Sequence, residues 1–442
     1  MNEIIRLTLC LVPYLSKPPL QQLRHIVLAV LCMTGRVTML GLSRWTEGGG
    51  SYRTVQRWFQ TPLAWGTVLW LVVRTHLLDP QGVYLLAGDD VVVSKAGKKT
   101  PGVGRFYSSL AQRPIPGLSF LALSLIDVEK RRSYPLAIEQ HLPAVKAAPT
   151  AEPDQPAAKR GRGRPKGSKN HARAAPTLNA ELTLLQSQVR GVLKRMAPLV
   201  VKHLVLDGFF GTYPASWVVR DCGLHLISKL RHNAALYCPY TSPKPKRGPT
   251  PRYGDKLDYK SLPQSACCSS LTEGRFVIDT YHLTVGHKDF SDWLNVVVLV
   301  KTDSRSRKRS HVVLFSTDLS LSAEQIVDYY SLRFQIEFNF RDAKQYWGLE
   351  DFMNVSDVAV TNAVNLAFLM VNLSAVLLPA HRQQPPDFSV IDLKSHFRSR
   401  RYLSDVIKSL PDSPPSDFIL RLGRRLSALG GIRPPSDFQH AA

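Results

Sequence analysis

The segment YYSLRFQIEFNFRDAKQYWG, residues 329–348, most constrains the fold because it carries two faces of opposite character. At about 100° per residue on a helix, five polar positions fall within a sector of roughly 80°. These positions are Tyr330, Arg333, Glu337, Arg341 and Lys344. Apolar residues at steps of three and four form a separate stripe: Leu332, Ile336, Phe340, Ala343 and Trp347. The pattern predicts one helix with a buried stripe and a single carboxylate, flanked by three cations and a phenol, that faces outward.

Signals at both ends of this segment support a single helix. Ser322 with Gln325 three residues later is a capping-box pattern, and Gly348 follows the last periodic residue as a C-cap. The polar face has a second interpretation: a solvated surface with ion pairs four residues apart, such as Arg333 with Glu337. The rest of the chain decides between the two.

The charge of the chain points to a polyanionic partner. Its 442 residues, 44% of them hydrophobic, are enough for two or three globular domains, yet the net charge is +23. Nucleic acid is the first candidate for such a basic protein, and a membrane surface is the second.

The cysteines and the apolar segments favour a cytoplasmic protein. Six scattered cysteines form no Cys-x-x-Cys pair, so we expect neither a zinc site nor a disulfide framework. The first sixteen residues lack the features of a signal peptide. The most apolar run, Val358 to Leu378, contains Asn362, Asn365 and Asn372, which would be costly in lipid. We expect it to be a buried helix, with no membrane partner.

Residues 1–80 are predicted to form an N-terminal helical DNA-binding domain. Within it, SYRTVQRWFQ (51–60) follows a turn at Gly48–Gly50 and predicts a short helix with Arg53 and Arg57 facing outward. Such a helix fits the major groove of DNA as a recognition helix. The alternative is a helical hairpin that only packs.

From Gly82 onward, short apolar runs predict strands. They are 83–93, 118–128, 132–140, 202–210 and 224–230, with helices predicted at about 177–197 and 212–221. The order describes an α/β fold with a mixed sheet and helices on its faces. Further strands at 276–285, 293–300 and 311–315 indicate a β-rich insertion, about 238–300, ahead of the segment 329–348.

A basic loop interrupts the sheet at residues 145–176. It is rich in Ala, Pro, Gly and cations and has no aromatic residue, so it cannot bury apolar surface. Its centre, Arg162-Gly163-Arg164-Pro165, resembles an AT-hook, in which two guanidinium groups enter a narrow minor groove. The alternative is a non-specific basic linker.

Three acids are placed where they could meet. Asp89 closes the first predicted strand, Asp207 closes a later one, and Glu337 lies on the helix. Carboxylates brought together repel each other, so such a cluster makes sense only around divalent cations. Mg²⁺ suits oxygen ligands, and two such ions about 4 Å apart can support in-line phosphoryl displacement. Asp90 beside Asp89 is an alternative first ligand.

The spacing Tyr330-x2-Arg333-x3-Glu337-x6-Lys344 resembles the YREK signature of DDE transposases from bacterial insertion sequences, the insertion-sequence-four-like group. The resemblance implies an RNase H-like mixed-sheet catalytic core over residues 81–380, interrupted by the β-rich insertion. It implies Asp89, Asp207 and Glu337 as catalytic residues that bind two Mg²⁺ ions, with Mn²⁺ as a substitute. Tyr330, Arg333 and Lys344, with Arg341 beside them, would grip the transposon end.

The resemblance also implies partners. We expect cut-and-paste DNA transposition by a homodimer that binds terminal inverted repeats and target DNA, in the cytoplasm at the nucleoid. Two alternatives are an RNase H-fold DNA nuclease that hydrolyses without joining, and a domesticated DNA-binding protein without turnover. The C-terminal stretch, residues 381–442, is Pro- and Arg-rich with helical pieces and suggests no function.

Overall fold

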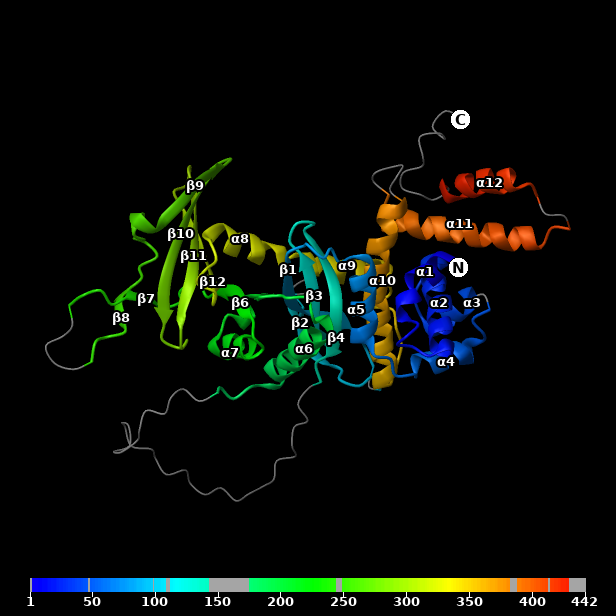
Figure 1. Ribbon diagram of the computed structural model, residues 1–442, viewed down its shortest axis with the longest axis horizontal. Coiled ribbons are helices and arrows are strands. Elements are labelled where there is room, and N and C mark those ends of the chain that lie inside the picture. Colours follow the sequence, from blue (N-terminus) through cyan, green and yellow to red (C-terminus); the bar gives the residue numbers. More distant parts are fainter. Residues whose placement is uncertain are drawn as a thin grey trace, which may run out of the picture. The chain divides into compact units, whose positions relative to one another are not determined.

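A computed structural model describes residues 2–46, 48–97, 99–108, 112–142, 175–243, 249–381, 388–411 and 414–428 (Figure 1). The chain divides into two compact units. The first contains Met1–Gln140, Gln188–Val205 and Asp328–Ala442, and the second contains His141–Ser187 and Leu206–Val327. A boundary between the units falls within each of two helices, α6 (Ala180–Met196) and α8 (Ala323–Leu332).

The sheet of the first unit is built on two long antiparallel strands. β1 (Tyr84–Ser94) pairs with β3 (Arg113–Asp127) along its whole length, with Asp89 opposite Ala122. The other edge of β3 pairs with β2 (Gly104–Ser108) and β4 (Arg132–Gln140), and β5 (His203–Leu206) lies next to β1 in the strand order. The mixed α/β architecture confirms the predicted fold class and is that of an RNase H-like core.

Helices form the N-terminal part of the first unit, as predicted. They are α1 (Asn2–Leu7), α2 (Lys17–Cys32), α3 (Met39–Trp45), α4 (Tyr52–Phe59) and α5 (Trp65–His76). Their apolar side chains join one buried cluster with the sheet and with the later helices; it includes Leu23, Phe59, Val68, Val91, Phe120, Ile336 and Phe368. The predicted division at residue 80 stays a prediction, but the hydrophobic core runs across it.

The apolar run is a buried helix, α10 (Asp357–His381), as predicted. It is long and apolar enough to span a membrane, yet most of it is buried inside the described part of the protein. α5, α9 and α10 pack against β4 (Figure 1). The asparagines explain why the helix can be buried: Asn362 donates to the carbonyls of Phe59 and Thr61, and Asn372 donates to that of Pro135. Each amide thus donates to a buried carbonyl that water cannot reach in the folded protein.

The prediction of one helix through residues 329–348 is wrong: α8 ends at Leu332 and α9 (Gln335–Tyr346) begins after a break. At the break, the N–H groups of Arg333 and Phe334 bond to carbonyls three residues back, at 3.2 Å each. This tighter turn changes the direction in which following side chains point. The predicted ends are right, because Ser322 and Gln325 form the capping box and Gly348 has φ +76°.

The apolar stripe is buried as predicted. Leu332, Ile336, Ala343 and Trp347 are fully or almost fully buried, and Phe340 packs edge-on against Phe368 of α10. The apolar stripe therefore holds α9 against the core, independently of the contacts made by the polar face.

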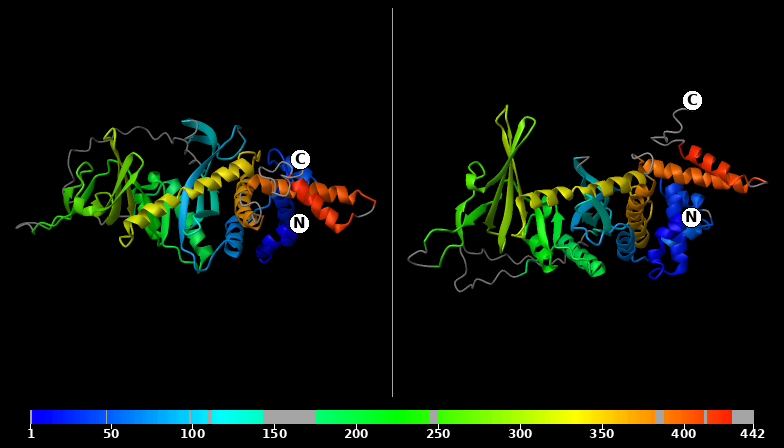
Figure 2. Two further views of the ribbon diagram at one scale, coloured as in Figure 1. Left: turned by 90° about the horizontal axis from the view of Figure 1, so that it is seen from above. Right: turned by 45° about the horizontal axis from the view of Figure 1, so that its top comes forward.

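The second unit is mainly an antiparallel sheet with the strand order β6-β12-β11-β10-β7-β8, and β9 also pairs with β10. The strands are β6 (His225–Leu230), β7 (Leu236–Pro239), β8 (Tyr253–Lys256), β9 (Cys267–Glu273), β10 (Phe276–His287), β11 (Trp293–Asp303) and β12 (Arg309–Ser316). The longest pair, β10 with β11, is drawn in yellow-green in Figure 2. α7 (Tyr213–Asp221) packs on β6.

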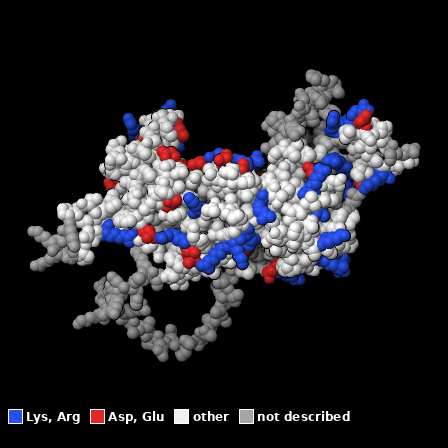
Figure 3. All heavy atoms as spheres, viewed as in Figure 1, with Lys and Arg blue, Asp and Glu red and all other residues white. Residues whose placement is uncertain are grey.

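The C-terminal stretch forms two helices, α11 (Val390–Lys408) and α12 (Ser416–Ala428), which lie side by side (orange and red in Figure 2). Ser389 and Asp392 form a capping box at the start of α11. All six cysteines are free thiols, in agreement with the prediction of no disulfide framework. Lys and Arg side chains are spread over the face shown in Figure 3, as the net charge requires.

Candidate functional site

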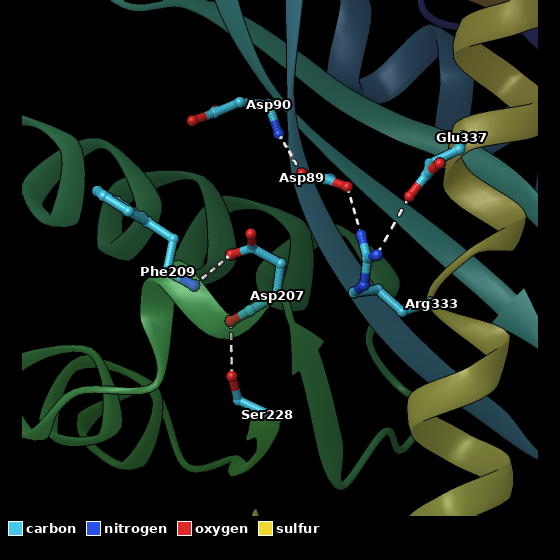
Figure 4. Close-up of polar contacts among 7 residues, drawn as sticks. All are labelled: Asp89, Asp90, Asp207, Phe209, Ser228, Arg333 and Glu337. Atoms are coloured by element: carbon cyan, nitrogen blue, oxygen red, sulfur yellow. Dashed lines mark hydrogen bonds and ion pairs between the residues drawn. The ribbon is translucent and has the colours of Figure 1, made fainter. Parts of the chain in front are cut away.

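Two of the predicted acids meet on one arginine in the first unit (Figure 4). Nη1 of Arg333 donates to Oδ2 of Asp89 at 2.5 Å, and its Nη2 donates to Oε1 of Glu337 at 3.1 Å. The exposed fractions of the side chains are 15% for Arg333, 20% for Asp89 and 40% for Glu337. One cation thus bridges two carboxylates that are distant in sequence and open to solvent on the Glu337 side.

Strand alternation explains why Asp89, rather than Asp90, takes part. Neighbouring side chains on a strand point to opposite faces of the sheet, so only one of the two can face α9. Asp89 does so, and its Oδ1 also accepts a hydrogen bond from the backbone N–H of Asp90 at 2.9 Å. The predicted position of Asp89 at the end of a strand is wrong: β1 continues to Ser94, so Asp89 lies in its middle.

The environment of Arg333 keeps it charged. Burial lowers the pKa of its guanidinium, but the neighbouring groups of Asp89, Tyr330 and Glu337 outweigh this effect and raise the pKa above its usual value. The two carboxylates therefore face a permanent cation. Their oxygens are of the type that divalent cations prefer, and binding of a metal by these two residues stays a prediction.

Of the other polar positions of the signature, Tyr330 and Lys344 lie near Arg333 or β1, and Arg341 does not. Tyr330 is half-buried on α8. Nζ of Lys344 donates to the carbonyl of Val92 on β1 at 2.8 Å and pairs with Glu350 at 3.1 Å. Arg341 is 58% exposed and pairs with its neighbour Asp342. The predicted ion pair between Arg333 and Glu337 is present, and Arg341 is paired elsewhere.

Asp207 directly follows β5, as predicted, and it belongs to the second unit, which begins again at Leu206. Its Oδ1 accepts from the N–H of Phe209 at 3.0 Å, so it caps the short 3-10 turn Gly208–Phe210 (Figure 4). Oγ of Ser228 donates to the Asp207 carbonyl at 2.6 Å and ties it to β6. Sequence reasoning missed Ser228, because its partner lies 21 residues away and no local pattern marks the pair. That Asp207 joins Asp89 and Glu337 stays a prediction.

The predicted recognition helix is present as α4, after glycines with positive φ at Gly48 and Gly50. Arg53 and Arg57 are both exposed on it. Val55, Trp58 and Phe59 form its buried side. A role of the two arginines in binding DNA stays a prediction. The AT-hook-like residues Arg162 and Arg164 lie outside the described residues.

We expect the substitution Arg333→Gln to destabilise the metal-free protein by about 2–4 kcal/mol, because it leaves two close carboxylates without their cation. The effect is below that of a fully buried pair, since Glu337 is partly solvated. Urea unfolding in EDTA measures it, and added Mg²⁺ should restore part of the loss by neutralising the same carboxylates.

The matched control is Arg341→Gln on the same helix, where an exposed pair is lost. Its free energy of unfolding should change by less than about 0.5 kcal/mol. Equal stability of the two variants would show that Arg333 is not needed to hold the carboxylates together.

Comparison with known proteins identifies one family. Residues 10–283 match the family model described as DDE superfamily endonuclease, which is more than half of the chain. The match includes Asp89 and Asp207 and ends before α9. No curated protein matches the chain.

Proposed function

Because the chain belongs to the DDE superfamily endonucleases, we propose that it is a DNA transposase of the YREK-signature group that cuts at transposon ends and joins them to target DNA. Membership of the family makes it a phosphodiester-cleaving enzyme with DNA as its substrate. The observation that carries the proposal is the meeting of Asp89 and Glu337 on Arg333. Arg333 and Glu337 belong to the segment that has the complete YREK spacing.

Asp207 is proposed as the third acid of the site. β5 lies next to β1 in the strand order, and Asp207 directly follows β5. Its second carboxylate oxygen is not used by the cap, which engages Oδ1. These three carboxylates would hold Mg²⁺ ions, and the bound ions would supply activation of the attacking water or hydroxyl and stabilisation of the leaving oxygen.

The basic residues have complementary roles in this proposal. Arg333 neutralises the two acids, and it would be free to contact a DNA phosphate if a divalent cation bound by these acids took over that charge. Lys344 is held at β1 by the Val92 carbonyl and lies on α9 two turns after Glu337. Tyr330, Arg341, Arg53 and Arg57, with Arg162 and Arg164, are proposed to contact DNA along the transposon end. A homodimer would bring two terminal inverted repeats together.

A joining assay tests the proposal. Purified protein is incubated with Mg²⁺, a labelled duplex that carries the DNA bracketing the reading frame, and a supercoiled target plasmid. We expect the label to appear covalently joined to the plasmid, because the 3′-hydroxyl freed by cleavage can attack target DNA without ATP.

The family description as an endonuclease favours one alternative, a nuclease that does not join. Cleaved duplex without joined plasmid would support that alternative. No Mg²⁺-dependent cleavage of either DNA, compared with the same reaction in EDTA, would contradict both.

A further inference from the structure

A cationic cavity of about 560 Å³ lies directly beside Asp207 in the second unit. It is lined by Gly208, by the end of β6 with residues 231–233, and by the start of β12. Its basic side chains are Lys229, Arg231, His232 and His311, and no Asp or Glu is among the lining residues. The cavity therefore presents two permanent cations with no carboxylate in its lining to neutralise them.

The two strong cations are free to bind. Lys229, Arg231 and His232 are exposed. Within the described ranges of the chain, neither Lys229 nor Arg231 forms an ion pair. Bringing two such cations to one cavity costs repulsion, which an anion would relieve.

Lys229 lies against the residue that follows Asp207. A Cβ placed on Gly208 would lie 3.6 Å from Cβ and 3.7 Å from Cγ of Lys229, so the lysine stem runs along this glycine. Ser228, the neighbour of Lys229 on β6, donates to the Asp207 carbonyl. The cavity and the second acid therefore keep their relative position within one unit.

The β12 side of the cavity, next to β6, is preorganised. The ring of His311 stacks on Tyr259 with centroids 4.6 Å apart. Its Nε2 lies 2.6 Å from the carbonyl of His232, so this nitrogen carries the proton and donates. Burial raises the pKa of Tyr259 to about 12, and its hydroxyl donates to the carbonyl of Ala234 at 2.7 Å. The imidazole is thus held in place before any ligand arrives.

We propose that this cavity binds backbone phosphates of DNA next to the bond that is cut, with Lys229 and Arg231 as the phosphate ligands and His311 as part of a fixed wall. Arg231 can contact a phosphate with two parallel hydrogen bonds, and Lys229 supplies a mobile point charge. An open cavity whose cations are exposed suits a continuous strand, whose phosphates repeat along the groove. The inference rests on the proposed function for the identity of the strand.

Salt-dependent binding tests this site without requiring cleavage. The full chain is titrated into a fluorescein-labelled random duplex of about 30 base pairs in EDTA, over a range of salt concentrations. For the double variant Lys229→Gln/Arg231→Gln, the slope of log Kobs against log salt should become shallower by about 1.8, since each phosphate contact contributes about 0.9. Affinity at about 0.1 M salt should fall roughly tenfold or more.

The matched control is Arg305→Gln/Lys308→Gln, which removes the same charge from the exposed turn between β11 and β12, outside the cavity. We expect it to keep nearly the wild-type slope. The charge-retaining variant Lys229→Arg/Arg231→Lys should keep nearly the wild-type slope, because the slope reports the number of charges. A urea unfolding midpoint of the glutamine variant equal to that of the wild type excludes misfolding as the cause. Equal losses in both glutamine variants, or no loss in either, would overturn the proposal.

Failure of this site and failure of the proposed function are distinguishable. If the glutamine variant of the cavity binds normally while the joining assay succeeds, only the phosphate site is wrong. If it binds weakly while no cleavage or joining is found, the chain binds DNA at this cavity without the proposed activity. Inorganic phosphate added at constant ionic strength should not displace the duplex, because a single anion lacks the neighbouring phosphates.

Discussion

Replacing Glu337 by glutamine is expected to lower Mg²⁺-dependent DNA cleavage by roughly 10³-fold or more, a barrier increase of about 4 kcal/mol. Glutamine keeps the size of the side chain but removes the negative charge that would hold the metal. Asp89 keeps its bond to Arg333, so the local structure should persist. Cleavage rates of a labelled duplex measure the loss, and equilibrium binding in EDTA should stay within about twofold of the wild type.

Asp328→Asn is the matched control for this prediction. Asp328 lies in the same unit and also pairs with a cation, Arg131, and among the described residues no ion pair joins it to Asp89 or Arg333. Its cleavage rate should remain close to that of the wild type. If Glu337→Gln retained more than a tenth of the activity, or lost binding and cleavage together, a metal-binding role for Glu337 would be wrong.

Replacing Asn362 by leucine is expected to lower the free energy of unfolding by roughly 3–5 kcal/mol. The side chain is 1% exposed and makes three hydrogen bonds. It donates to the carbonyls of Phe59 and Thr61 and accepts from Nε1 of Trp65 at 2.7 Å. Leucine has a similar size, so the loss comes from leaving these buried groups without partners. Urea unfolding measures the change.

Asn372→Leu on the same helix provides the comparison. Asn372 is equally buried, yet it donates one bond to Pro135, and its Oδ1 has no partner in the part of the chain that is described. The substitution should therefore cost only about 1–2 kcal/mol. Similar losses for the two variants would show that size, rather than hydrogen bonding, sets the stability at these positions.

Much of the fold follows from local patterns in the sequence. The apolar stripe from Leu332 to Trp347 predicts the buried side of α9, because a helix with one apolar face must cover it. Alternating and apolar runs bounded by Gly and Pro predict the strands around Asp89 and Asp207. The asparagines of α10 indicate burial in protein rather than in lipid, since each amide needs polar partners.

The local sequence does not predict the break between α8 and α9. Neither Arg333 nor Phe334 is a helix breaker, so propensity favours a continuous helix there. Arg333 is bonded to Asp89, 244 residues earlier in the chain. A contact of that kind depends on tertiary packing, which no periodicity encodes. The same limit applies to Ser228 and to the cavity beside Asp207, whose lining comes from separate strands.

The hydrophobic core that joins the N-terminal helices to β1 limits how such a protein can evolve. Val91 and Val93 lie on the same face of β1 as Asp89. They belong to the same buried cluster as Leu23 of α2 and Val68 of α5. A chain cut near residue 80 would leave these apolar surfaces facing water. The N-terminal helices therefore cannot be exchanged between relatives as an independent domain; change on this part of the protein has to arise by substitutions at exposed positions of the existing helices.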